Sequence, residues 1–198
     1  MANICDWRML IKGNNRDDIN TLYSYLASKS IFKINEKTGE RTLDKCIYRG
    51  DDGVEIPVKH HFFGVGYEGY VEKGDEFQHN SSFYLECCGT CKWSVNDCFL
   101  YPSSDNILTI DMFKATADLN LMVEIFSKES GLQLAEHYII QNGKMLKSEV
   151  KNYKRFFLEM FDSKEEAEKE IGMPISSKQW KNQDKIEVGY FDEEFGII

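Results

Sequence analysis

The chain has 198 residues, of which 42% are hydrophobic and 29% are charged, and its formal net charge is -9. Aromatic residues make up 13%, so the sequence has enough bulky apolar side chains to bury a core without disulfides or metal. A net negative charge repels a phosphate backbone, and the basic residues form no cluster. The composition therefore argues against nucleic acid as a partner.

The start of the chain and its cysteines bear on the compartment. Charges at Asp6, Arg8 and Lys12 interrupt the continuous apolar stretch that a secretory signal requires. No run reaches the roughly 18 apolar residues of a membrane helix, so no membrane association is expected. We expect a cytoplasmic protein whose thiols are reduced. The six cysteines are Cys5, Cys46, Cys87, Cys88, Cys91 and Cys98.

The first predicted elements are a strand and a helix. From Cys5 to Lys12 apolar residues alternate with mostly charged ones, which is the pattern of a half-buried strand, and Gly13 ends it. Asp17 can then begin a helix in which apolar residues recur at helical spacing as far as Leu26.

The middle of the chain is less regular. From Lys33 to Glu86 the turn sequences KTGE, DDGV and EKGD separate short apolar pieces, which predicts an irregular insertion with hairpins. Residues Lys92–Tyr101 and Ile107–Phe113 read as two strands joined by a turn at PSSDN. Asp118 then favours the start of a second helix, with apolar residues at helical spacing from Leu119 to Phe126.

Turn and helix-capping residues define the elements more clearly near the C-terminus. Asn142 and Gly143 lie between two strand-like segments and predict a tight hairpin, because both residues tolerate positive φ. Ser163 and Glu166 form a capping box for a short charged helix that should end at Gly172. The remaining residues, which end in KIEVGYFDEEFGII, are expected to supply a last strand.

These elements predict the fold class. The order strand, helix, strand, strand, helix, strand is the split β-α-β arrangement called ferredoxin-like, an α+β fold whose antiparallel sheet carries two helices on one face. We therefore predict one domain over 1–198, with an insertion at about 33–86 and a C-terminal extension at about 162–198. The alternative is an α+β domain with a separate small subdomain made from these two segments. The strands expected in one sheet are Cys5–Lys12, Ile107–Phe113 and Leu132–Ile140.

Several short sequences match the pattern of a known family. They are Asn3, Cys5, Ile11, Gly13, GTCKW at Gly89–Trp93, and Thr116–Ala117. On these residues the chain resembles the YubB-like ferredoxin-like domain family of small plasmid- and phage-associated bacterial proteins, and it departs from that family's pattern at Cys88 and Cys91. The resemblance implies the ferredoxin-like fold and a mobile-element setting, and it implies no activity and no iron-sulfur cluster.

The stretch ECCGTCKWSV holds three cysteines and is the first candidate for a metal or redox site. Cys88 and Cys91 form a CxxC pair that could share one zinc ion, with Cys87 and Cys98, or a histidine pair, as further ligands. A redox thiolate needs a helix N-terminus, whereas the residues after Cys91 read as a strand. We favour packed, reduced thiols without metal or cofactor, and zinc binding is the alternative.

Other sequence patterns are weaker indications of a functional site. The sequence GVGYEG at Gly64–Gly69 matches the nucleotide-binding GxGxxG, but no helical period follows it. His60 and His61 are adjacent, so their side chains should point in opposite directions and not share a metal. His137 lies among apolar residues of a predicted strand, where a structural role is expected. The carboxylates of SKEEAEKE at 163–170 are expected to form a solvated helix face.

No catalytic constellation is visible, so the expected function is a non-catalytic binding or interaction protein with a protein partner. Trp7 and Trp93 are candidates for an exposed sheet surface that contacts this partner. A second hypothesis is an acidic protein that mimics the charge of nucleic acid, which requires carboxylates clustered on one face. A third is an enzyme, which requires a deep pocket with convergent titratable groups.

Overall fold

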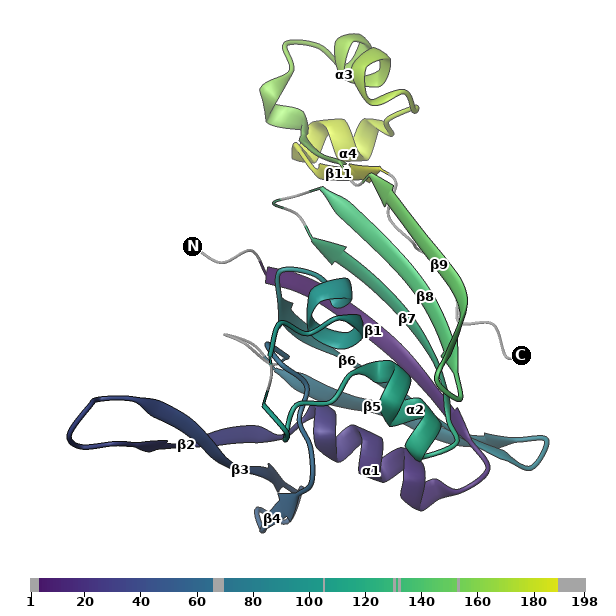
Figure 1. The fold of residues 1–198 in the computed structure, drawn as a ribbon. Helices are drawn as coiled ribbons and strands as arrows, with labels where there is room; N and C mark the ends of the chain where they lie inside the picture. Colours follow the sequence, from purple (N-terminus) through teal and green to yellow (C-terminus); the bar gives the residue numbers. More distant parts are fainter. Residues whose placement is uncertain are drawn as a thin grey trace.

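The computed structural model describes residues 4–65, 70–104, 106–129, 131, 133–152 and 154–188. Its largest element is a six-stranded antiparallel sheet in the order β5-β6-β1-β7-β8-β9 (Figure 1). The six strands are β1 Ile4–Gly13, β5 Val71–His79, β6 Ser82–Lys92, β7 Met122–Glu129, β8 Leu134–Gln141 and β9 Lys144–Asn152.

Two α-helices and a short π-helix pack on one face of this sheet. They are α1 (Arg16–Leu26), α2 (Met112–Asp118) and the π-helix η1 (Asn96–Leu100). The Asn15 side chain accepts a hydrogen bond from the Asp17 amide at the start of α1. Asp111 accepts one from the Lys114 amide at the start of α2. Both helices therefore begin at a residue whose side chain satisfies an otherwise unpaired backbone amide.

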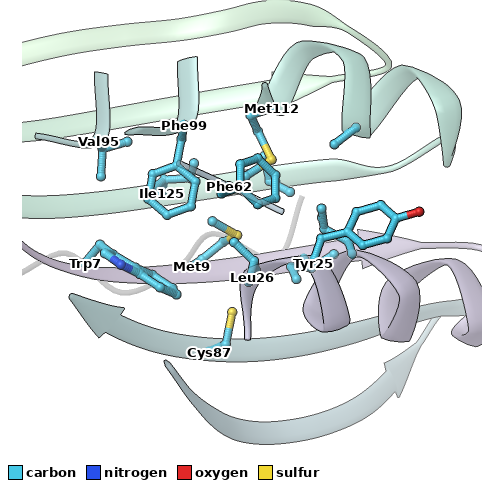
Figure 2. Packing of buried hydrophobic residues seen from close by; sticks show 14 of the residues in the cluster. Trp7, Met9, Tyr25, Leu26, Phe62, Cys87, Val95, Phe99, Met112 and Ile125 are labelled. Carbon is cyan, nitrogen blue, oxygen red and sulfur yellow. The ribbon is translucent and has the colours of Figure 1, made fainter. Parts of the chain in front are cut away.

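The hydrophobic core lies between the sheet and these helices (Figure 2). Every second residue of β1 points into it, in the period expected for a strand with one buried face. Trp7 of β1 is 3% exposed and packs edge-on against Phe99 of η1, with ring centroids 5.4 Å apart. The other core residues of β1 are Cys5, Met9 and Ile11.

A buried carboxylate ties η1 to the sheet. Glu136 of β8 points to the core side, and its Oε2 accepts hydrogen bonds from the Val95 amide at 2.9 Å and the Ser127 hydroxyl at 2.7 Å. Its Oε1 accepts from the Tyr138 hydroxyl at 3.0 Å and the Asn96 amide at 3.4 Å. Burial, followed by the Glu136 carboxylate, raises the pKa of Tyr138, so the phenol remains a donor.

Two smaller sheets complete the described chain. In the first, β2, β3 and β4 are hydrogen-bonded in that order, and the β2–β3 hairpin projects away from the main sheet (Figure 1). In the second, β10 pairs with β11, and residues of this C-terminal segment form a small apolar cluster of their own. The elements are β2 Lys29–Ile34, β3 Arg41–Arg49, β4 Glu55–Val58, β10 Lys154–Phe157, the 3-10 helix η2 Leu158–Met160, α3 Lys164–Ile171, α4 Ser177–Asn182 and β11 Lys185–Val188.

The predicted ferredoxin-like fold is wrong. The structure is mostly antiparallel β, with a six-stranded sheet and two further sheets in place of a simple split β-α-β sheet with two helices on one face. The range expected as a second helix, Leu119–Phe126, mostly forms β7. Val123 and Ile125 are buried on the core side of β7, and this period of two competes with the helical spacing seen in the same residues.

Other expected strands are also displaced. The range Ile107–Phe113 forms a turn, an isolated bridge between His61 and Thr109, and the start of α2. The range Lys92–Tyr101 leaves the sheet after Lys92, because Trp93 adopts a φ of 71° and η1 follows. Within the expected insertion at 33–86, β5 and the first residues of β6 belong to the main sheet.

The elements predicted from clear alternation, turn residues or helix caps are confirmed. The first strand and first helix form β1 and α1, and the hairpin between β8 and β9 turns at Asn142 (φ 48°) and Gly143 (φ 77°). Helix α3 begins after Ser163 and ends at Gly172, which has a φ of 79°. The last predicted strand is present as β11, and its expected continuation at 189–198 lies outside the described residues, as does Leu132. No helix among the described residues is long and apolar enough to cross a membrane.

Candidate functional site

The cysteines of ECCGTCKWSV lie on both faces of the main sheet. In β6, Cys87 is opposite Met9 and points to the core, whereas Cys88 is opposite Arg8 and points to the other face. Cys91 is opposite Cys5, a cysteine that the sequence spacing did not suggest as its neighbour. The four cysteines of the zinc alternative, Cys87, Cys88, Cys91 and Cys98, are therefore not all brought together: Cys91 and Cys98 are in contact, whereas Cys88 lies on the other face. Within the described ranges, no group of three or more His, Cys, Asp or Glu side chains is arranged to hold a metal ion.

The buried thiols are poor nucleophiles. Hydrogen bonds with the Cys5 and Cys98 thiols, together with burial, raise the pKa of Cys91 well above its usual range. Burial raises the pKa of Cys87 as well. The Cys98 thiol donates to the Lys92 carbonyl at 2.7 Å, so it also has a structural contact. These groups have the character of packed core residues.

This arrangement predicts how the six free thiols react. Cys88 is partly exposed and the other five are buried, so a maleimide should label Cys88 first in the native protein. All six should react once the chain is unfolded in denaturant. Mass spectrometry of labelled peptides checks the order. Rapid native labelling of Cys91 or Cys98 would contradict the packing described above.

The two candidate surface residues, Trp7 and Trp93, do not form a shared surface. Trp7 lies in the core, which corrects the expectation that it lines an exposed sheet face. Trp93 is 36% exposed, and the Lys92 ammonium lies 4.2 Å from its ring centroid. Trp93 follows the last residue of β6 and has a φ of 71°, so it lies beyond the end of that strand and not on a face of the sheet.

The adjacent histidines point to different surroundings, as expected. His61 contacts Ser30 Oγ through Nδ1 at 3.3 Å and Thr109 Oγ1 through Nε2 at 3.2 Å. His60 packs edge-on against Tyr25, with ring centroids 5.5 Å apart. Burial lowers the pKa of both histidines. They line separate cavities of about 480 Å³ for His60 and about 640 Å³ for His61.

Only part of the GVGYEG sequence falls within the described residues, since 66–69 lie outside them. Gly64 has a φ of 74°, and its carbonyl accepts a hydrogen bond from the Lys92 amide at 2.9 Å. A Cβ at this position would lie 2.9 Å from Cys98 Sγ. Backbone conformation and close packing therefore explain this glycine.

The strongest candidate site lies on the sheet face that points away from α1 and α2, which we call the outer face. Register partners in an antiparallel sheet share a face, so the pairing defines a row of side chains across all six strands. We call it the central row. Its members, in order from β5 to β9, are Glu72, Cys88, Arg8, Phe126, His137 and Glu149.

Phe126 is at the centre of this row. The Arg8 guanidinium carbon lies 4.6 Å from the Phe126 ring centroid, and the His137 ring stacks on Phe126 with a centroid distance of 4.0 Å. His137 Nε2 also lies 2.8 Å from Glu124 Oε1, so two titratable groups form a buried pair. Sequence reasoning missed this pair because Glu124 was expected on a helix.

Two rows flank the central row on the outer face. The first contains Glu86, Leu10, Glu124, Ile139 and Lys147, and the second contains Thr90, Asp6, Lys128, Ala135 and Lys151. The charges of the three rows together are unevenly distributed, since β5 and β6 contribute Glu72 and Glu86. Three lysines lie on β7 and β9. The outer face thus has an acidic edge, an apolar and aromatic centre, and a lysine-bearing side.

One carboxylate, Glu149, lies between the two lysines of β9 on this side. Glu149 lies 2.8 Å from the Lys151 Nζ and 3.6 Å from the Lys147 Nζ. The hydrogen bond from Lys151 is the largest influence that holds the pKa of Glu149 below its usual range. Glu149 therefore remains ionised and leaves this part of β9 with an excess of positive charge.

The centre of the outer face is buried. Leu10, Phe126 and His137 are each at most 4% exposed, and Glu124 is 5% exposed. A buried polar side chain is tolerated when it has a hydrogen-bonding partner, and Glu124 and His137 provide this for each other. A histidine beside a carboxylate has the components of a general base, but burial closes this pair to a substrate atom.

Comparison of the sequence with protein-family models and with curated proteins, and of the fold with solved structures, finds no match to this chain.

Proposed function

We propose that this chain is a non-catalytic binding protein whose outer face holds a partner segment that combines aromatic and acidic side chains. The observation that carries the proposal is the outer face itself, an apolar and aromatic centre beside three lysines in a protein whose net charge is -9. Aromatic side chains can pack on Ile139, which is partly exposed and lies in the same row as Leu10. Carboxylates can pair with the ammonium groups of Lys147 and Lys151.

The alternatives from the sequence have less support. A mimic of nucleic-acid charge needs carboxylates gathered on one face, whereas the outer face carries lysines on β7 and β9 as well as carboxylates on β5 and β6. The zinc alternative needs converging ligands, and Cys88 lies on the opposite face from Cys87 and Cys91. We place the protein in the cytoplasm, because six free thiols suit a reducing compartment. The YubB-like resemblance adds a plasmid or phage setting to the proposal.

A direct binding assay tests this function. A labelled ten-residue peptide with two phenylalanines and three carboxylates is titrated with the full-length protein and followed by fluorescence anisotropy. A second full-length protein, with Phe191 and Phe195 replaced by serine, is measured beside it, because the terminal sequence GYFDEEFGII has the same composition as the peptide. We expect saturable binding with a Kd of about 10 µM in at least one of the two proteins.

The specificity of this binding is tested with matched variants. Lys147→Glu with Lys151→Glu should weaken peptide binding about tenfold, because two attractive contacts become repulsive. Lys37→Glu with Lys45→Glu removes the same charge from exposed sites on the β2–β3 hairpin and should leave binding unchanged. A peptide with lysines in place of its carboxylates should not bind. Absence of saturable binding in both proteins, or equal binding of both peptides, would overturn the proposed function.

A further inference from the structure

The cavity beside His60 lies apart from the outer face, on the side of the main sheet that α1 and α2 cover (Figure 1). We call it the His60 cavity. Its volume is about 480 Å³, which is within the range of small-molecule sites. It is formed by α1, α2 and the segment that follows β4. Its polar lining residues are Tyr25, Lys59, His60, Lys114 and Asp118.

His60 is the residue of this cavity whose polar atoms the fold does not satisfy. It is 9% exposed, and neither of its ring nitrogens has a hydrogen-bond partner among the described residues. Burial is the main cause that lowers the pKa of His60, so the neutral ring has one N–H donor and one acceptor nitrogen. The Leu108 carbonyl opposes this shift, but it already accepts the His61 amide at 2.9 Å and has no proton for the acceptor nitrogen.

The adjacent histidine shows that the same segment can satisfy an imidazole. Both ring nitrogens of His61 lie within reach of a hydroxyl group, Ser30 Oγ at 3.3 Å and Thr109 Oγ1 at 3.2 Å. Unpaired polar atoms at a buried position lower the stability of a fold, so the two nitrogens of His60 require an explanation other than packing. A hydroxyl group can donate to one type of imidazole nitrogen or accept from the other, as the pair around His61 shows.

The charges around the His60 cavity favour an anion. Lys59 has no carboxylate partner among the residues that the structure describes. Lys114 Nζ lies 3.0 Å from Asp118 Oδ2, so this lysine and this carboxylate offset each other. The cavity therefore has an excess of one positive charge in a protein whose net charge is -9. A phosphate or carboxylate group can pair with the ammonium groups of Lys59 and Lys114.

We propose that the His60 cavity binds a small hydroxylated anion, a molecule that carries a phosphate or a carboxylate on a polyol chain. The anionic group pairs with Lys59 and Lys114, and hydroxyl groups of the chain form hydrogen bonds with the ring nitrogens of His60. Ile110 and Leu119 line the same cavity and can contact the carbon atoms of the ligand. This site goes beyond the proposed function, because none of its residues belongs to the outer face.

A stability measurement tests whether the fold leaves His60 unsatisfied. His60→Phe keeps a ring against Tyr25 and removes both unpaired nitrogens, so without ligand this variant should be at least as stable as the wild type. His61→Phe loses its contacts with Ser30 and Thr109 and should be less stable than the wild type. Urea unfolding followed by circular dichroism measures both. A loss of stability in His60→Phe as large as that in His61→Phe would overturn the inference.

Isothermal titration calorimetry of the full-length protein tests the ligand class. The probes are glycerol 3-phosphate, glycerate and inorganic phosphate. At least one of the two hydroxylated anions should bind with a Kd of about 100 µM, and inorganic phosphate should bind about tenfold more weakly. Lys59→Gln should weaken binding about tenfold, because the anion loses its unpaired cation. The matched control Lys29→Gln removes the same charge from an exposed position in β2 and should bind as the wild type does.

Nuclear magnetic resonance locates the bound probe. In the wild type, the Cε1–H resonance of His60 should shift saturably, whereas that of His137 on the outer face should not. No saturable binding of either hydroxylated anion, equally tight binding of inorganic phosphate as an adventitious ion only, or equal binding by Lys59→Gln would overturn the inference. These probes and variants differ from those of the peptide assay, so failure here is distinguishable from failure of the proposed function.

Discussion

Replacing Glu136 with alanine should lower the free energy of unfolding by about 3 to 5 kcal/mol, because four hydrogen bonds lose their common buried acceptor. Glu136 is 3% exposed, so water cannot take the place of its carboxylate without entering the core. The donors left behind are Val95 N–H, Asn96 N–H, Ser127 Oγ and Tyr138 Oη. Urea unfolding followed by circular dichroism measures the change.

The controls identify the carboxylate as the cause. Glu136→Gln keeps one acceptor oxygen in the same volume and should cost about half as much as alanine. Glu165→Ala in the first turn of α3 removes an exposed carboxylate and should change stability by about 0.5 kcal/mol or less. The near-ultraviolet signal should also weaken in Glu136→Ala, because η1 holds Phe99 against Trp7. A loss below about 1 kcal/mol would contradict the assigned role.

Gly89→Ala should destabilise the protein by about 3 kcal/mol, because β6 has no space for a methyl group at this position. A Cβ on Gly89 would lie 2.4 Å from the Tyr70 carbonyl oxygen and 2.8 Å from Cζ2 of Trp7. Trp7 is the register partner of Gly89 and is itself fixed in the core, so neither neighbour can move cheaply. The glycine of GTCKW is therefore explained by packing against an indole ring.

Gly50→Ala provides the matched control for this prediction. A Cβ on Gly50 would approach only the end of the flexible Asp52 side chain, at 3.0 Å. We expect a change of less than about 1 kcal/mol for Gly50→Ala in the same urea titration. Equal stabilities of Gly89→Ala and the wild type would show that β6 and Trp7 are not packed as described.

Elements with strong local chemistry could be predicted from the sequence. The alternation in β1, the glycine that ends α3 and the Asn142–Gly143 turn depend on residues close together in the chain. The second half of the core could not be predicted in this way, because the spacing from Leu119 to Phe126 fits both a helix and a strand. Pairing with β1 and β8 decides in favour of β7, and this contact is between distant parts of the chain.

The candidate site was harder to predict than the fold. Arg8 of β1 is far in sequence from Phe126 and His137 of the consecutive strands β7 and β8, and no local spacing relates it to them. The sequence directed attention to CxxC because its spacing is local, whereas the nearest thiols to Cys91 include Cys5 on another strand. A correct strand assignment for residues 122–129 would have placed Glu124 and Phe126 on one face of that strand, and the pairing with β1 adds Arg8 to the same face.

The central claim is that the outer face is a binding surface, and chemical-shift mapping tests it most directly. The full-length Phe191→Ser and Phe195→Ser protein, labelled at its methyl groups and backbone amides, is titrated with the peptide GYFDEEFGII. Binding at the outer face predicts saturable shifts of the Leu10 and Ile139 methyl groups and of the Phe126 amide. The methyl groups of Leu22 in α1, on the core side, should not move. Shifts concentrated at α1 and β2, or no saturable shifts at any concentration, would contradict the claim.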